Sequence, residues 1–340
     1  MSQLAISSIL FYLSMPTHLI NKIHTGVTRL MTALTLLLIT YLPACTLGSA
    51  SSSSSPKSAV LHKTANPTPF ADVHLHYNWD QEEIIDPATV VQRLRDENII
   101  LGIIFSTPTE NALKIKNAAG DRIIPLFSPY LTQPHRQGWY LDETVVELAR
   151  EGLESKKYFG IGELHLWSGL PPRTDNKILT GLFKLAEQFE VPFLLHTESS
   201  DEKYMINICQ QHSRVRILWA HAGGILKPDA VAKVIQQCPN LWVEVSARDP
   251  WRYDSLVDDN GELPDSWKKL FIKYPDRFMT GSDPVWGVTK TQRWDEPDEG
   301  WDHLHELIKF HRHWLSSLPA NVEKKIRLTN ALEFFRVNAP

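Results

Sequence analysis

Residues 158–198 read YFGIGELHLWSGLPPRTDNKILTGLFKLAEQFEVPFLLHTE, and this stretch decides the fold class. Two short apolar runs, near 158–166 and 191–198, have the length of buried strands. Between them, Asn176 is a favourable helix-capping residue, and the segment that follows it has apolar residues at helical spacing. A strand, a helix and a second strand in this order predict one parallel βαβ unit.

The same alternation recurs along the chain from Phe70 onward. Six further strand-like runs lie near 71–76, 99–106, 122–128, 216–223, 241–247 and 277–283. Helix starts between them are indicated at Asp86-Pro87, Asp142 and Pro228-Asp229. Eight strands with helical crossovers predict a single α/β domain, a closed (β/α)8 TIM barrel. An open doubly wound sheet is less favoured because no glycine-rich phosphate loop follows the first run.

The size and composition of the chain fit this architecture. Its 340 residues are 43% hydrophobic and 22% charged, which are ordinary values for a soluble globular protein with a sizeable core. The formal net charge of -4 provides no global field that would attract a polyanion, so nucleic acid is not an expected partner. Small neutral or cationic substrates are favoured, and the sequence leaves the oligomeric state open.

The first 45 residues differ from the rest of the chain. The run MTALTLLLITYLPAC at 31–45 is too short to span a bilayer and ends in small residues, which is typical of a secretory signal peptide. Its last four residues resemble a bacterial lipobox, so we expect export to the periplasm and a lipid anchor at Cys45. A plain signal peptide or a short hydrophobic anchor is the alternative. We expect a Ser- and Pro-bearing linker at 46–69 and the barrel at 70–340.

Polar side chains that bind metals occur at the ends of five of the predicted strands. They are His74, His76, Glu163, His165, His196, His221 and Asp283. Because the carboxyl ends of TIM-barrel strands meet at one mouth, these side chains are expected to converge there. Burying several ionisable groups without a partner would be costly, and a bound cation removes that cost. Imidazoles and carboxylates without thiolates suit one or two catalytic ions of zinc, manganese or iron.

Five short motifs, in their order and spacing, give the chain a specific resemblance. They are DVHLH at 72–76, LLHTE at 194–198, WAHAGG at 219–224, TGSDP at 280–284 and NALEFF at 330–335. The sequence resembles the amidohydrolase superfamily, and particularly its amidohydrolase-related branch of TIM-barrel, metal-dependent hydrolases. The resemblance implies a divalent metal, with zinc as the first expectation, bound by His74, His76, His196 and Asp283.

The fourth predicted strand leaves two alternatives. Relatives with two metals often carry a carbamylated Lys there, whereas this chain has Glu163, as TatD-like nucleases do, and Glu163 would then bridge two ions. Alternatively, His165 binds substrate above a single ion. The resemblance also implies that His221 binds metal or polarises the substrate. Asp283 would take a proton from the metal-activated water and pass it to the leaving group.

Tryptophans are abundant in the segments that follow the predicted strands, which indicates an aromatic pocket around the metal. We expect Trp79 and Trp286 to contact substrate, with His165 and Arg248 as polar anchors. His135 or Arg136 is a further candidate anchor. An organic ester, lactone or amide suits such a pocket, so metal-dependent hydrolysis of a small organic substrate is the predicted function.

Three other functions remain open at this stage. A TatD-like phosphodiesterase or deoxyribonuclease shares the barrel, but the acidic residues at 295–299 oppose binding of a phosphate backbone. A metal-dependent decarboxylase is the second, and Arg248 near the metal would favour a carboxylate substrate. The third is an exported lipoprotein that binds without turnover, although binding alone does not require Asp283 as a base. The sequence does not decide whether Cys209 and Cys238 form a disulfide.

Overall fold

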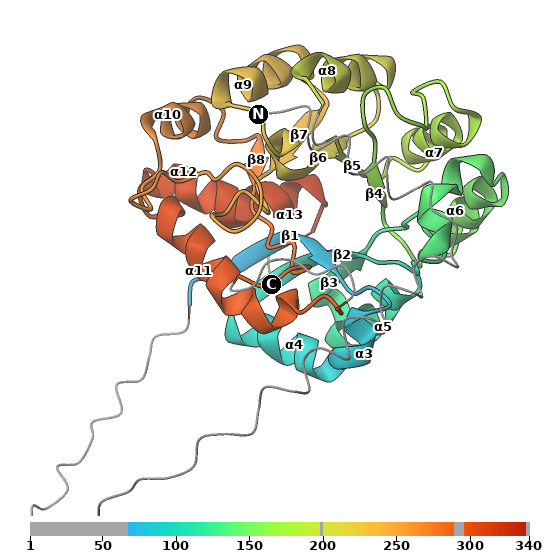
Figure 1. Cartoon of the computed structure of the whole chain (residues 1–340), viewed down its shortest axis with the longest axis horizontal. Helices are drawn as coiled ribbons and strands as arrows, with labels where there is room; N and C mark the ends of the chain where they lie inside the picture. The colour runs from blue at the N-terminus through green and yellow to red at the C-terminus, as the bar shows by residue number, and fades with distance from the viewer. Residues whose placement is uncertain (1–66, 198–199, 289–295, 338–340) are drawn as a thin grey trace, which may run out of the picture. The chain divides into compact units, whose positions relative to one another are not determined.

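The computed structural model describes residues 67–197, 200–288 and 296–337. Within them, eight parallel strands follow one another around a common centre (Figure 1). In chain order, each strand pairs with the next within β1–β3 and within β4–β8. The strands are β1 Phe70–His76, β2 Ile99–Phe105, β3 Ile123–Pro125, β4 Ile161–His165, β5 Phe193–His196, β6 Ile217–Trp219, β7 Leu241–Glu244 and β8 Phe278–Met279.

Backbone hydrogen bonds join these two sets of strands into one closed barrel. Beyond β3, Phe127 forms a parallel bridge with Ile161, and the Gly162 N–H donates to the Phe127 carbonyl at 2.8 Å. Between β8 and β1, the Val73 N–H donates to the Thr280 carbonyl at 3.0 Å. Every strand therefore has a neighbour on both sides, and the predicted (β/α)8 barrel is confirmed.

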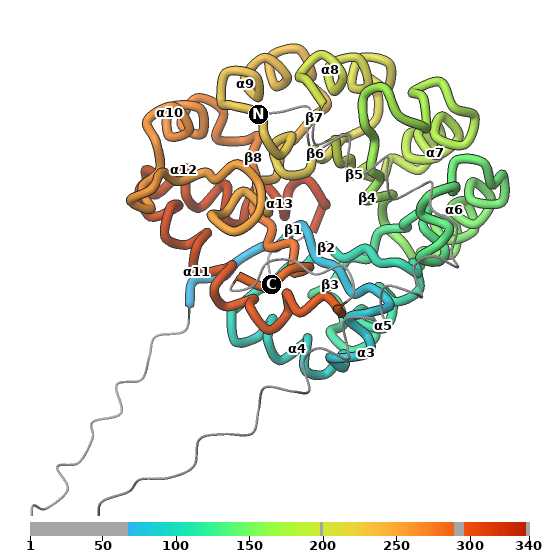
Figure 2. Tube along the Cα trace, viewed as in Figure 1, coloured from blue at the N-terminus to red at the C-terminus, as the bar shows by residue number. Residues whose placement is uncertain are grey.

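Helices connect successive strands and form a layer outside them, as the trace in Figure 2 also shows. The longer helices are α4 Pro87–Asp96, α5 Asn111–Ala119, α6 Thr144–Glu154, α7 Lys177–Gln188, α8 Glu202–Gln211, α9 Pro228–Gln237, α10 Asp265–Lys273 and α11 Leu304–Leu315. Three short ones are α3 Gln81–Ile84, α12 Ala320–Lys324 and α13 Asn330–Phe334.

The helix starts read from the sequence agree with the structure. The Asp86 side chain accepts hydrogen bonds from two backbone N–H groups in the first turn of α4, and Pro87 occupies the first helical position. Asn176 caps α7 in the same way, and α9 begins at Pro228. Such caps satisfy N–H groups that have no partner within the helix, which is why they mark its start reliably.

Two buried apolar clusters hold the barrel together. One combines the helices with the strands, and the other combines alternate strand residues with Leu328, Leu332 and Phe334 of the C-terminal helical segment. Arg216, directly before β6, donates to the Phe334 carbonyl, which places α13 at the amino-terminal ends of the strands. The C-terminal segment therefore covers the end of the barrel opposite the strand carboxyl ends.

Cys209 of α8 and Cys238 at the end of α9 form a disulfide bond, with Cα atoms 5.8 Å apart. The sequence left this pairing undecided, because it does not give the distance between adjacent helices. No helix in the described ranges is long and apolar enough to cross a membrane. The expected signal peptide and lipobox, with nearly all of the expected linker, lie outside the described residues.

Candidate metal centre

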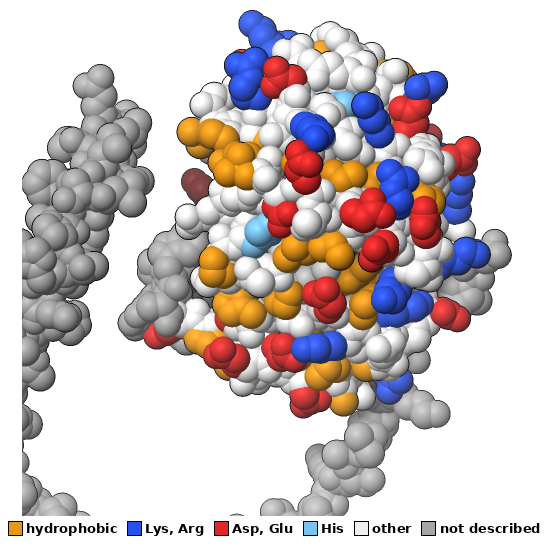
Figure 3. Space-filling view, turned by 90° about the vertical axis from the view of Figure 1, so that its right-hand side faces the viewer, with side chains coloured by type: hydrophobic (Ala, Val, Ile, Leu, Met, Phe, Trp, Pro, Cys, Tyr) orange, Lys and Arg blue, Asp and Glu red, His pale blue; other side chains and the backbone are white. Residues whose placement is uncertain are grey.

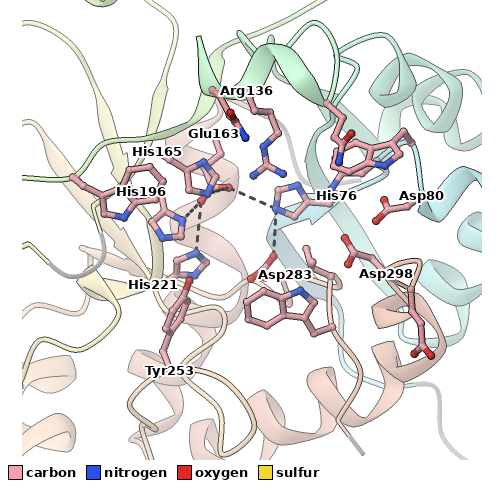
Figure 4. Close-up of a pocket in the computed structure, with 18 residues that line it drawn as sticks. His76, Asp80, Arg136, Glu163, His165, His196, His221, Tyr253, Asp283 and Asp298 are labelled. Carbon is pink, nitrogen blue, oxygen red and sulfur yellow. Dashed lines mark hydrogen bonds and ion pairs between the residues drawn. The ribbon is translucent and has the colours of Figure 1, made fainter. Parts of the chain in front are cut away.

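A pocket of about 470 Å³ opens at the carboxyl ends of the strands (Figure 4). Six of the seven metal-binding side chains found in the sequence line it, and His74 lies buried directly beneath them. In Figure 4 the imidazoles come from both sides of the barrel and face Glu163 near the centre. The convergence expected from a TIM barrel is therefore present.

Four side chains place their donor atoms around one point. The Nε2 atoms of His74 and His76 lie 3.2 Å apart. Asp283 Oδ1 is 3.7 Å from His74 Nε2 and 3.3 Å from His76 Nε2, and Glu163 Oε2 is 3.7 Å from both. An ion with tetrahedral bonds of about 2.0–2.1 Å holds its ligand atoms about 3.3–3.4 Å apart. The donors of His74, His76 and Asp283 therefore form one candidate group for a divalent ion, and Glu163 lies beside both imidazoles of that group.

Glu244 of β7 orients this first group from behind. Its carboxylate is fully buried and lies 3.0 Å from His74 Nδ1, and it also accepts the backbone N–H groups of His221 and Ser246 at 2.8 and 2.7 Å. Burial alone would raise the pKa of Glu244, but His74 and these hydrogen bonds lower it to about 2. Because an ionised carboxylate only accepts, His74 carries a proton on Nδ1, so Nε2 is the ring atom that would bind an ion.

Glu163 also faces a second group of imidazoles with its other oxygen. Its Oε1 atom is 2.7 Å from His196 Nδ1 and 3.6 Å from His221 Nε2. His221 Nδ1 lies 2.9 Å from the Ser246 hydroxyl and 3.1 Å from the Ser246 carbonyl oxygen. A carbonyl only accepts hydrogen bonds, so Nδ1 carries a proton and Nε2 is the ring atom that faces Glu163.

The WAHAGG motif forms a tight turn that aims His221 into the barrel mouth. His221 itself has a positive φ of 55°, and Gly223 has a φ of 72°. A Cβ atom on Gly223 would lie 2.5 Å from the Trp219 ring, so only glycine fits this position without a shift. The motif thus contributes backbone shape as well as a candidate metal ligand.

Asp283 is held in place by a buried arginine that the sequence analysis missed. The Arg252 guanidinium donates to the carbonyls of Ser282 and Asp283 and lies 3.5 Å from Asp283 Oδ2. Asp249 balances its charge, accepting from Arg252 Nε at 2.8 Å. Burial alone would raise the pKa of Asp283, but His74 and Arg252 hold it below its ordinary value. The carboxylate is therefore ionised and aimed at the imidazoles.

His165 lies in the wall of the pocket, and its donor atom is within 4.8 Å of those of Glu163 and His196, so it belongs to a candidate metal-binding group. Its ring stacks on His196, with centroids 4.3 Å apart, and Tyr130 lies within hydrogen-bond distance of its Nδ1 atom. Its Nε2 atom is 3.8 Å from Glu163 Oε2. Tyr130 had no part in the sequence prediction, because it follows β3 by several residues and belongs to no recognisable motif.

The expected substrate anchors are only partly where the sequence placed them. Trp79 and Trp286 line the pocket, as does Arg136. Arg248 does not: its side chain is fully buried, donates to the carbonyls of Gly224 and Leu226, and stacks over a tryptophan of α10. Arg248 therefore stabilises the loops after β6 and β7 and is not available to a substrate in the pocket.

The outer wall of the pocket is acidic and aromatic. Trp167 and Tyr253 join the two tryptophans already named, while Asp80, Glu296 and Asp298 lie nearer the mouth. Burial and the neighbouring Asp80 raise the pKa of Asp298 to about 8. His135 pairs with Asp142 at 3.2 Å instead of lining the pocket, and Trp294 and Asp295 lie outside the described residues.

A protein-family model described as Amidohydrolase matches residues 71–337 of this chain. The chain belongs to the amidohydrolase family, and the resemblance stated from the motifs is confirmed. A search of curated proteins finds no match.

Solved structures support the same barrel. The TatD homologue YjjV from Escherichia coli K12 has a TM-score of 0.57 at 14% identity, covering 79% of this chain and 98% of that chain. A mutant organophosphorus hydrolase has a TM-score of 0.53 at 11% identity, covering 78% and 92%. A 2,6-dihydroxybenzoate decarboxylase has a TM-score of 0.51 at 12% identity, covering 79% and 99%. At these identities the similarity shows the fold alone.

Proposed function

We propose that this chain is a metal-dependent hydrolase that cleaves an ester, lactone or amide bond in a small organic substrate. The observation that carries the proposal is the group of donor atoms from His74, His76 and Asp283, which all lie within 4.8 Å of one another, with Glu163 Oε2 3.7 Å from both imidazoles. Buried carboxylates and neutral imidazoles in such an arrangement suit zinc, manganese or iron.

The two oxygens of Glu163 support a site for two ions. Oε2 faces His74 and His76, while Oε1 faces His196 and His221, so the carboxylate lies between two groups of imidazoles. We infer that Glu163 would contribute to the binding of two ions, one held also by His74, His76 and Asp283 and the other by His196 and His221. Tyr253 packs beside both imidazoles of the second group and limits its exposure to solvent.

A divalent ion bound here supplies a water nucleophile at neutral pH and polarises the bond to be cleaved. Asp283, ionised and fixed by Arg252, accepts the proton of the attacking water and passes it to the leaving group. Arg252 and Asp249 keep the carboxylate in one orientation during this transfer. The aromatic wall around Trp79 and Trp286 excludes water and packs against the organic part of the substrate.

The charges of the pocket argue against a nuclease. Asp80 and Glu296 add acidic groups to Glu163 and Asp283, whereas the pKa of about 8 of Asp298 favours its neutral form at pH 7. Arg136 is the only Lys or Arg among the described residues that line the pocket. On the face drawn in Figure 3, acidic and basic side chains are interspersed, with no basic stripe for a phosphate backbone.

Decarboxylation is the second candidate function, and Arg136 favours it. Its guanidinium lies over the Tyr130 ring in the wall of the pocket, where it interacts with Asp298 and is placed to pair with a substrate carboxylate. One solved neighbour, similar in fold alone, is a decarboxylase complexed with 2,6-dihydroxybenzoate. A non-catalytic binding protein is less favoured, because binding does not require Asp283 with its buried arginine.

The test of hydrolysis is a screen of esters, lactones, amides and aromatic carboxylates with the zinc-loaded, full-length protein. We predict turnover of at least one hydrolysable substrate. Asp283→Asn should keep metal in the site but lower kcat by about 100-fold or more, because the proton acceptor is lost. Full activity in that variant would remove the proton-transfer role from Asp283. Release of carbon dioxide without hydrolysis would favour the decarboxylase instead.

We also propose that the protein is exported and attached to a membrane through a lipid on Cys45. The signal-like run at 31–45 supports this, as does the disulfide, because disulfides persist mainly in oxidising compartments such as the periplasm. Cys45→Ala should move the protein from the membrane fraction to the soluble fraction of the cell. An unchanged membrane fraction would rule out the lipid anchor.

A further inference from the structure

Tyr130 and His165 form a hydrogen-bonded pair in the wall of the pocket. The Tyr130 hydroxyl oxygen lies 2.8 Å from the backbone N of His165 and 3.0 Å from its ring Nδ1. Tyr130 is buried, with 4% of its surface exposed. The His165 ring is stacked on His196 and lies 5.6 Å from the ring of Trp167, so its orientation is set by packing on several sides.

These two contacts determine where the His165 proton lies. A backbone N–H only donates, so the Tyr130 oxygen accepts from it. The phenol keeps its own proton at neutral pH, as a tyrosine ordinarily does. Nδ1 of His165 is the only hydrogen-bond acceptor near the hydroxyl within the described residues. The O–H therefore donates to Nδ1, because the opposite arrangement would leave a buried O–H without an acceptor.

The other imidazoles of the site show the reverse arrangement. His74 Nδ1 faces the carboxylate of Glu244, and His221 Nδ1 faces the carbonyl of Ser246, so both nitrogens carry protons and both Nε2 lone pairs are available to an ion. His165 has its lone pair on Nδ1 and its proton on Nε2. An Nε2 atom that bears a proton has no lone pair for a metal.

We propose that Tyr130 is a positioning residue that holds His165 as a neutral imidazole with its proton on Nε2, so that His165 donates a hydrogen bond to a substrate oxygen and does not bind metal. The substrate role rests on the proposed hydrolytic function, whereas the position of the proton does not. This assignment settles the choice left open at the fourth strand: Glu163 binds the ions and His165 binds the substrate.

A small crevice beside the pair is the site for that oxygen. It has a volume of about 20 Å³, enough for one water-sized group, and both Tyr130 and His165 line it. Ser106 and Arg136 also line the crevice, and the Ser106 hydroxyl is buried with no hydrogen-bond partner in the described part of the chain. Three residues with hydrogen-bond donors, Ser106, Arg136 and His165, thus line one crevice of about the size of an oxygen atom, and donors of this kind stabilise negative charge that develops on a substrate oxygen.

The test is the position of the ring proton, read by nitrogen NMR of the full-length, zinc-loaded protein containing 15N-labelled histidine. His165→Gln identifies the His165 signals. We expect the proton on Nε2 in the wild type, and a shift towards the Nδ1-protonated form in Tyr130→Phe, because the O–H that fixes the tautomer is gone. Tyr158→Phe is the matched control, a buried tyrosine away from His165, and should leave the His165 signals unchanged.

Metal content gives an independent readout. Tyr130→Phe and His165→Gln should retain the wild-type number of ions per chain, because neither removes a ligand. A zinc-bound Nε2 atom on His165, an unchanged tautomer in Tyr130→Phe, or loss of an ion in His165→Gln would each overturn the proposal. If Tyr130→Phe fails to fold, the wild-type spectrum alone decides the position of the proton.

Activity then tests the substrate role. With a substrate from the screen, His165→Ala should lower kcat by about 100-fold, and His165→Gln, which retains an N–H donor, should recover part of the loss. Equal kcat in His165→Ala and the wild type would remove His165 from the reaction. If the wild type binds no metal and turns over nothing, the proposed function fails, while the same spectra of the metal-free protein still decide the tautomer.

Discussion

The single carboxylate of Glu244 is buried at the back of the site and accepts hydrogen bonds from three N–H groups. It fixes the tautomer of His74 and also the backbone position of His221, so it couples the two groups of imidazoles. The sequence contains a signal for it, since Glu244 is the one charged residue in the apolar run at 241–247. Glu244 was not among the predicted site residues, because these were chosen at the carboxyl ends of the predicted strands and Glu244 lies in the middle of its run.

Glu244→Gln tests this coupling. A glutamine has one acceptor oxygen and would place an N–H₂ group against an N–H donor, so at least one of the three hydrogen bonds is lost. We predict a zinc affinity lower by about 10- to 100-fold, measured by competition with a chelator. Glu306→Gln, on the exposed face of α11, is the matched control and should bind zinc as the wild type does. An unchanged affinity in Glu244→Gln would show that Glu244 does not orient the ligands.

Two arginines four residues apart show a limit of sequence reasoning at this scale. Arg248 and Arg252 lie on the same loop after β7, yet Arg252 reaches Asp283 while Arg248 is directed at the neighbouring loop. The chain turns at Ala247, which has a φ of 54°, so the directions of both arginines depend on the geometry of this loop. A left-handed alanine has no reliable sequence signal, so the choice between the arginines was not predictable.

His311 of α11 should contribute a pH dependence to stability. It is buried against Trp314, and burial lowers its pKa to about 4. The pKa of this imidazole is about 6.5 in the unfolded chain and about 4 in the folded chain. At a pH between these two values the unfolded chain binds a proton that the folded chain does not, so stability is lost as the pH falls through this range. For a shift of this size we predict a loss of about 3 kcal/mol.

The measurement is urea unfolding of the metal-free protein at pH 7 and pH 4.5. His311→Gln cannot take up this proton, so the variant should lose less stability than the wild type between the two pH values. An equal loss in both proteins would show that the His311 imidazole does not titrate in this way.

At the scale of elements, the sequence predicted strand positions well and strand lengths poorly. β3, β6 and β8 have three, three and two residues, whereas the apolar runs that predicted them are longer. The run near 216–223 leaves the ladder at Ala220, because its WAHAGG motif turns through residues with positive φ. The apolar runs therefore predicted where the strands lie, but the strands are shorter than the runs because the motifs at their carboxyl ends form turns.

The disulfide between α8 and α9 should be a strong contributor to stability. It closes a loop with a sequence separation of 29 residues between two buried cysteines. A loop of this length corresponds to about 3–4 kcal/mol of unfolding free energy in the chain-entropy model. We predict that Cys209→Ala lowers the free energy of unfolding in urea by about this amount. Reducing agent should have the same effect on the wild type and no further effect on the variant. Equal stability of oxidised and reduced wild type would contradict the prediction.

At the scale of the whole molecule, barrel closure accounts for why the site was largely predictable. Parallel strands in a ring bring their carboxyl ends together, so residues spread from His74 to Asp283 meet without any knowledge of helix packing. The contacts behind them, from Glu244, Arg252 and Tyr130, depend on how loops fold over the ring. Loop geometry depends on turns and on tertiary contacts, and neither follows from periodicity.

The central claim is a Glu163-bridged centre, and the count of metal ions per chain tests it most directly. Metal content of the full-length protein should be measured by plasma emission spectroscopy after loading with zinc and removal of free ions, for the wild type, Glu163→Gln and the control Glu306→Gln. The account predicts two ions in the wild type and in the control, and one or none in Glu163→Gln. A single ion that Glu163→Gln leaves unaffected, or no metal in the wild type, would contradict it.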